Sequence, residues 1–207
     1  MQQARHIFLA ILGQFFLAPA LLACECAWQG PFSWLVDEAD VVALVSMEGG
    51  KGNSRDVRVD DLLKGQEFEP KIRLWGKYKN QCRANLNQFP VGSRWLVALT
   101  RIKEIPDGGF NPSTPNVSFG RLGDYPLSSC GGYWLKEKNG QLTGNITSVF
   151  EWDYDPGMDP VPYDVMADFV AGKASYKDII EHSGEVTSPE AMMRRSKRAI
   201  GRPRDWE

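Results

Sequence analysis

Two cysteines separated by one residue are the part of the sequence with the clearest chemical potential. Cys24 and Cys26 lie in "LLACECAWQG", where an apolar segment gives way to ordinary polar sequence. Such thiols can be lipidated, can form disulfides, or can hold the edge of a binding site. With Cys82 and Cys130 the chain has 4 cysteines, an even count that suggests two disulfides in an oxidising compartment. Direct bonding of Cys24 to Cys26 would make a strained ring, so pairing with distant cysteines is favoured.

The segment before these cysteines has the order of a secretory signal. Arg5 precedes an apolar run at 7–17, and small residues follow it. The run is shorter than the roughly 20 residues that span a bilayer. We therefore expect residues 1–23 to be a signal peptide, and the protein to be exported, either secreted or periplasmic.

The same boundary leaves two other processing routes open. "LLAC" resembles the lipobox of bacterial lipoproteins, in which the cysteine is lipidated, and Cys24 would then anchor the chain to the cell envelope. That route leaves Cys26, Cys82 and Cys130 as an odd set, which the even cysteine count disfavours. Cleavage after Ala20 would instead leave three extra residues. We expect membrane association only if Cys24 is lipidated.

The remaining polar residues form no catalytic set. His182 is the one histidine after the signal, which disfavours histidine zinc sites and Ser-His or Cys-His dyads. Paired acids such as Asp60–Asp61 and Asp37–Glu38 are typical of solvated faces. We predict no enzymatic activity, no catalytic residues and no cofactor. The net charge of −2 also argues against a nucleic-acid partner.

An acidic stretch, "DYDPGMD", spaces Asp153, Asp155 and Asp159 as in a calcium loop, with Asp164 as the closing carboxylate. Met158 stands where such a loop needs glycine, and neighbouring prolines stiffen the segment. An acidic surface loop is the favoured interpretation, and we predict no metal site.

The elements that must position the cysteines are mostly strands. Apolar or alternating stretches separated by turn residues predict five or six short strands between 39 and 150, at 39–47, 55–65, 71–77, 93–103 and 130–147. Asn139-Gly140 between two of these stretches favours a tight hairpin. We predict a mostly β domain, a small closed barrel of about five strands similar to an OB fold, because closure removes exposed edges.

Composition divides the rest of the chain. The predicted barrel covers 24–150, and 151–187 is an acidic linker followed by short helices, indicated by the spacing of Val165, Phe169 and Val170. From 188 to 207 the chain is basic and poor in apolar residues, which predicts a flexible tail.

Taken together, "CECAWQGPF", "ADVVALVSM", "VRVDDLLKG", "KIRLWGK", Cys82, "VGSRWLVAL" and "CGGYWL…NGQLTGNI" resemble the netrin-type module of tissue inhibitors of metalloproteinases, including bacterial secreted versions. The resemblance covers Cys24 to about Phe150. It implies an OB-type barrel to which the Cys-x-Cys start is tied by disulfides Cys24–Cys82 and Cys26–Cys130.

The resemblance also implies a function. In those inhibitors the amino group and carbonyl of the first cysteine chelate the protease zinc, so Cys24, Glu25 and Cys26 would form the inhibitory ridge. Glu25 replaces a small hydroxyl residue, and its carboxylate would be desolvated in the protease pocket. We expect a noncatalytic extracytoplasmic binding module whose partner is a zinc metalloendopeptidase or another envelope or extracellular protein. The alternative is an envelope-anchored lipoprotein that uses the barrel as a structural or interaction surface.

Overall fold

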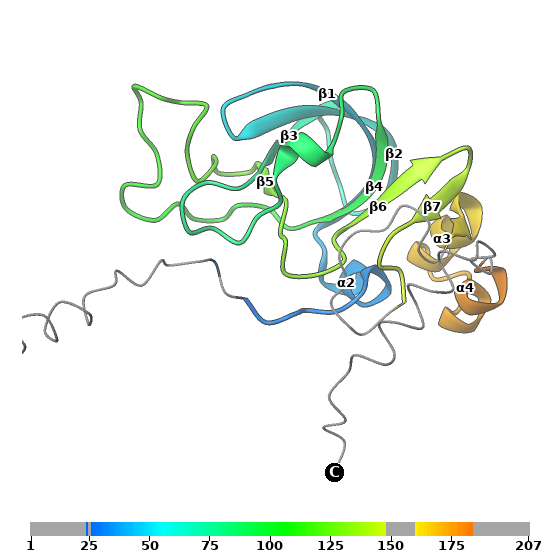
Figure 1. Cartoon of the computed structure of the whole chain (residues 1–207). Helices are drawn as coiled ribbons and strands as arrows, with labels where there is room; N and C mark the ends of the chain where they lie inside the picture. The colour runs from blue at the N-terminus through cyan, green and yellow to red at the C-terminus, as the bar shows by residue number, and fades with distance from the viewer. Residues whose placement is uncertain (1–23, 25, 148–159, 184–207) are drawn as a thin grey trace, which may run out of the picture.

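A single eight-stranded sheet dominates the structure (Figure 1). The computed structural model describes residues 24, 26–147 and 160–183. The strands are β1 Val41–Lys51, β2 Ser54–Lys64, β3 Lys71–Trp75, β4 Arg94–Leu99, β5 Tyr125–Pro126, β6 Trp134–Lys138, β7 Gln141–Thr143 and β8 Val161–Pro162. The helices are α2 Phe32–Glu38, α3 Tyr163–Val170, α4 Tyr176–His182 and the short 3-10 helix η2 Leu86–Gln88. The predicted mostly β class is therefore confirmed.

The sheet is open, and the prediction of a closed five-stranded barrel is wrong in this respect. Its order is β5-β3-β2-β1-β4-β6-β7-β8, so β6 to β8 extend the edge of β4 that a closed barrel would use. Strand β5 pairs with β3 over two residues only, in parallel. Beyond the strands, Ile102 N–H donates to the Asp124 carbonyl over 2.8 Å, and Gly123 N–H donates to the Ile102 carbonyl over 3.0 Å. These two hydrogen bonds hold the chain after β4 beside the chain before β5, but they do not form a continuous ladder between the two strands.

The first four strands form a Greek key. Strands β1, β2 and β3 are antiparallel neighbours in sequence, and β4 returns over a long connection to lie beside β1. This order, 4-1-2-3, defines the motif. The long connection between β3 and β4 carries Cys82, so the topology brings that cysteine out of the sheet and onto the surface loops.

The first seven residues of β1 are buried on both faces of the sheet, which explains why all of them but Ser46 are apolar. Val41, Val45 and Met47 point into one core together with Trp75, Trp95 and Phe89. Val42 and Leu44 point into a second core. Because successive side chains of a strand alternate between faces, seven consecutive buried residues from 41 to 47 require cover on both sides.

Helices cover the second core. Phe32 and Val36 of α2, Met166 of α3 and Ile179 of α4 are buried against it. Helices α3 and α4 lie within 151–187, the segment in which short C-terminal helices were predicted, and α4 begins at a capping box between Ser175 and Asp178. Helix α2 was not predicted, because seven residues are too few to show a clear helical period. No described helix is long and apolar enough to cross a membrane.

The predicted hairpin at Asn139-Gly140 is present between β6 and β7. Asn139 and Gly140 have φ of 55° and 77°, and Lys138 pairs directly with Gln141 across the turn. The Glu137 side chain accepts a 2.8 Å hydrogen bond from Gly140 N–H. These dihedrals match the two-residue turn that fits the twist of a hairpin.

Replacing Gly140 by valine is expected to lower the free energy of unfolding by about 1–2 kcal/mol, because a β-branched residue is strained at positive φ. A Cβ at this position meets open space, so the loss reports backbone conformation alone. Gly140→Asn is the matched control, since asparagine tolerates this region. Urea unfolding measures both variants, and equal losses would contradict the prediction.

Candidate functional site

Two disulfides fasten the start of the described chain to the fold. Cys24 is bonded to Cys82 with 5.2 Å between their Cα atoms, and Cys26 is bonded to Cys130 with 5.7 Å. This is the pairing that the resemblance implies. We call these four cysteines the clasp. Disulfides are compatible with an extracellular location, because such compartments are oxidising.

Backbone hydrogen bonds continue the attachment beyond the clasp. Gln29 N–H donates to the Cys130 carbonyl over 2.7 Å, and Gly132 N–H donates to the Gly30 carbonyl over 2.9 Å. The Tyr133 hydroxyl donates to the Gln29 side-chain oxygen over 2.6 Å. The chain from 26 to 30 is thus held along the 130–133 segment, and α2 follows at once.

The outer side of this attached segment is accessible. Cys26 and Ala27 are exposed, Cys24 is half-buried, and Trp34 of α2 keeps 51% of its surface exposed nearby in the chain. Trp28 is half-buried, and its indole Nε1 has no hydrogen-bond partner among the described residues. Glu25, the predicted centre of the ridge, lies outside the described residues. The structure therefore brings Cys24 and Cys26 together at the surface.

The sulfurs of the clasp are crowded. The Sγ atoms of Cys24, Cys26 and Cys82 all lie within 4.8 Å of one another. Metal ligation requires thiolates, and each of these sulfurs is bonded in a disulfide. The oxidised clasp therefore offers no thiolate ligand.

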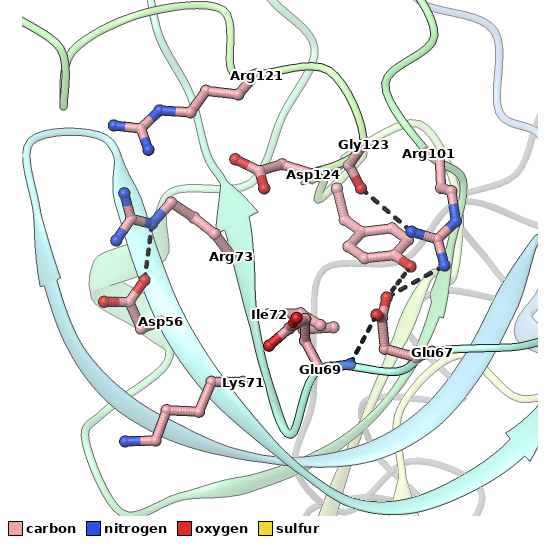
Figure 2. Close-up of a pocket in the computed structure, with 11 residues that line it drawn as sticks. Asp56, Glu67, Glu69, Lys71, Ile72, Arg73, Arg101, Arg121, Gly123 and Asp124 are labelled. Carbon is pink, nitrogen blue, oxygen red and sulfur yellow. Dashed lines mark hydrogen bonds and ion pairs between the residues drawn. The ribbon is translucent and has the colours of Figure 1, made fainter.

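A charged cleft that the sequence did not reveal lies over β3 and β5 (Figure 2). Its volume is about 480 Å³. The charged side chains that line it are balanced in sign: Asp56, Glu67, Glu69, Lys71, Arg73, Arg101, Arg121 and Asp124. They come from two strands and two connecting loops, so no spacing in the sequence could have grouped them.

Glu67 is the most constrained residue of the cleft. Its carboxylate accepts hydrogen bonds from the Tyr125 hydroxyl at 2.5 Å and from the backbone N–H groups of Phe68 and Glu69 at 2.9 and 3.2 Å. Arg101 adds an ion pair of 3.1 Å. Burial alone would raise the pKa of Glu67, but these donors together hold it below its ordinary value. A carboxylate that accepts from so many donors suits a structural role rather than that of a general base.

Arg101 links the loop at 65–70 to the connection between β4 and β5. Its guanidinium donates to the Gly123 carbonyl over 3.4 Å (Figure 2). It also donates to the Gln66 carbonyl over 2.7 Å and lies 4.9 Å from the centre of the Tyr125 ring. The loop at 65–70 is held in place by these contacts. Phe68 in that loop is nevertheless 88% exposed.

Two arginines lie on the opposite side of the cleft (Figure 2). Arg73 pairs with Asp56 over 2.7 Å, and this hydrogen bond is the main cause of its raised pKa. Arg121 extends on the same side of the cleft (Figure 2). Asp124 accepts a 2.8 Å hydrogen bond from the Trp75 indole. This pattern contains no nucleophile aligned with a base.

The other acids and the histidine noted in the sequence have structural contacts. Asp60 bonds Ser46, Arg58 and Arg94, and Asp61 accepts a 2.7 Å hydrogen bond from Tyr163. His182 ends α4, where its Nδ1 lies 2.8 Å from the Asp178 carbonyl oxygen.

The predicted calcium-like stretch falls largely outside the described residues, which exclude Asp153, Asp155 and Asp159. Asp164 is described, and it lies in the first turn of α3, where its Oδ1 accepts a hydrogen bond from Val165 N–H. The predicted signal peptide at 1–23, the acidic part of the linker and the tail at 188–207 also lie outside the described residues.

No protein-family model matches the chain, and no curated protein sequence matches it. The clasp and the cleft are therefore the two features of the described chain that bear on its function.

Proposed function

We propose that this protein is a noncatalytic extracytoplasmic binding module that uses Cys24, Glu25 and Cys26 as its recognition ridge. The observation that carries the proposal is the clasp, in which two disulfides and the Gln29–Cys130 hydrogen bond fix a segment whose outer residues are exposed. A segment that is ordered before binding loses little conformational entropy when it binds, so its contacts contribute more fully to affinity.

The strand order supports the proposal that the module is a netrin-type domain with an OB-like fold. The Greek key of β1 to β4, with β5 parallel to β3, is compatible with the partly open five-stranded OB barrel. On this proposal, β6 to β8 and the C-terminal helices are additions to that unit. The pairing of Cys24 with Cys82 and Cys26 with Cys130 agrees with the netrin-type arrangement.

The proposed partner is a zinc metalloendopeptidase. If processing leaves Cys24 as the first residue, its neutral α-amine and its carbonyl oxygen form a chelating pair suited to the open coordination position of a catalytic zinc. The next residue, Glu25, enters the neighbouring pocket. A carboxylate there is desolvated and repelled by the protease's own acid, so the natural sequence should inhibit weakly.

Glu25→Thr is expected to tighten inhibition of a zinc endopeptidase by about tenfold or more, which corresponds to about 1.4 kcal/mol. Extending the mature N-terminus by one alanine is expected to abolish inhibition, because the α-amine then leaves the zinc. The measurement is an inhibition titration of wild type and both variants. Glu69→Thr, which removes an exposed carboxylate from the cleft, is the matched control and should leave inhibition unchanged. Equal behaviour of all four proteins would refute the ridge.

The competing function is an envelope-anchored lipoprotein that binds a protein partner through another face. Phe68 at 88% and Leu122 at 64% exposure favour this candidate, because both adjoin residues of the charged cleft. The two functions differ at the α-nitrogen of Cys24. Intact mass and peptide analysis of the mature N-terminus separates them: a free amine with a disulfide supports the ridge, and a thioether-linked lipid supports the lipoprotein.

A further inference from the structure

Each disulfide of the clasp lies close to a sulfur atom of the other disulfide. Cys26 is bonded to Cys130, yet its Sγ lies within 4.8 Å of both sulfurs of the Cys24–Cys82 bond. Disulfide exchange proceeds by attack of a thiolate on a neighbouring disulfide sulfur, so proximity of this kind is its first requirement. Cys130 Sγ does not belong to this group of three.

The four cysteines also differ in accessibility. Cys26 is exposed, Cys24 and Cys82 are half-buried, and Cys130 retains only 8% of its surface. Cys26 is therefore the cysteine of the clasp most open to a reductant from solvent. Its sulfur is also the one that lies within 4.8 Å of both sulfurs of the second disulfide.

We propose that the clasp is a thiol–disulfide exchange site that reacts with a dithiol at Cys26 and then passes the exchange to the Cys24–Cys82 bond. The reacting partner belongs to the class of dithiol reductants, whether a protein dithiol or a small one. This inference concerns the sulfur chemistry of the clasp and does not depend on protease inhibition.

One thiolate of the dithiol attacks Cys26 Sγ, which breaks the Cys26–Cys130 bond and releases Cys130 as a thiol. The second thiol of the dithiol closes its own disulfide and releases Cys26 as a thiolate. Cys26 then attacks Cys82 Sγ, which forms Cys26–Cys82 and releases Cys24. The dithiol is oxidised by two electrons, and the protein gains two thiols, at Cys24 and Cys130.

Exchange would change the attachment of the segment around the clasp. After it, Cys24 is no longer tethered and Cys26 is fastened to Cys82 instead of Cys130. The hydrogen bonds from Gln29 to Cys130 and from Gly132 to Gly30 are independent of the sulfurs, so the chain at 29–30 stays in place. The effect is therefore confined to the residues before 29.

A matched pair of variants tests the inference in the full mature chain. Cys130→Ser and Cys26→Ser remove the same disulfide, but only the first leaves a thiol inside the group of three sulfurs. After anaerobic equilibration, free thiols are alkylated, and fragment ions that separate Cys24 from Cys26 locate the label. We expect alkylation of Cys24 to be at least about fivefold greater in Cys130→Ser than in Cys26→Ser, because a neighbouring thiolate is required for exchange. Equal labelling in the two variants overturns the inference.

Wild-type protein gives a second test that does not rely on the folding of a variant. One molar equivalent of dithiothreitol is added to the oxidised protein, followed by acid quenching, alkylation and peptide mapping. We expect a species labelled at Cys24 and Cys130 that contains a Cys26–Cys82 cross-link. Labelling confined to Cys26 and Cys130, or a lipid on Cys24 that leaves it without a thiol, overturns the inference.

Discussion

Replacing Cys26 and Cys130 together by alanine is expected to lower the free energy of unfolding by about 4 kcal/mol. The bond joins residues separated by 104 positions, so its loss greatly enlarges the conformational freedom of the unfolded chain. It also joins the segment before α2 to the segment that leads into β6. Urea unfolding followed by tryptophan fluorescence, without reductant, measures the loss.

The other disulfide supplies the comparison. Cys24→Ala combined with Cys82→Ala opens a bond of sequence separation 58, which the same chain-entropy argument values at about 4 kcal/mol. Because the two loops overlap, removing both bonds should cost less than the sum of the two losses. A loss below about 1 kcal/mol for either pair would show that the bond does not constrain the chain as described.

Tyr125→Phe is expected to lower the free energy of unfolding by about 2 kcal/mol at neutral pH, the scale of a hydrogen bond to a charged group. The Tyr125 residue is 1% exposed, and its hydroxyl bonds the Glu67 carboxylate, whose side chain is 8% exposed. Loss of the hydroxyl removes one donor from a buried carboxylate that cannot regain full hydration. Tyr163→Phe is the control, because its partner Asp61 is exposed, and its loss should stay below about 1 kcal/mol.

The effect of Tyr125→Phe should also depend on pH with a defined sign. Glu67 has a folded-state pKa below its ordinary value of 4.5, so its contacts stabilise the fold above that pH. The contribution is lost as the pH falls through the folded-state pKa, because the protonated acid no longer gains from its donors. Unfolding curves of wild type and Tyr125→Phe should therefore converge in acid. A difference that grows as the pH falls would contradict the role of the ionised carboxylate.

Local patterns in the sequence were enough to predict most strands and the β6–β7 hairpin. Alternating apolar and polar residues predict β2 and β3, and an apolar run predicts β1. Asn139 and Gly140 supply the positive φ that the turn requires. These features depend on neighbouring residues and on the period of a strand. Even so, the first strand was predicted to end at 47, whereas β1 continues to Lys51 because β2 pairs with it as far as Ser54.

Sheet closure is not a local property, and the prediction of it was wrong. Strand β4 could pair with β5, which would close the barrel, or with β6, which leaves the sheet open. The outcome depends on how strongly the sheet curves and on which strand edge the chain after β5 reaches. The two hydrogen bonds of Ile102 bring the chain after β4 beside the chain before β5, but β6 occupies the edge of β4 itself. Pairing between strands this far apart is set by tertiary packing rather than by strand propensity.

By itself, the sequence determined that this is a mostly β chain with four cysteines, because composition and short-range patterns carry that information. The cysteine pairing came from a family resemblance, since four cysteines allow three pairings. Only the tertiary structure decided which side chains meet. It buried Glu67 beneath Tyr125 and Arg101, and it placed the sulfur of Cys26 against a disulfide formed by Cys24 and Cys82. These contacts join residues tens of positions apart, and their distances follow from the path of the whole chain.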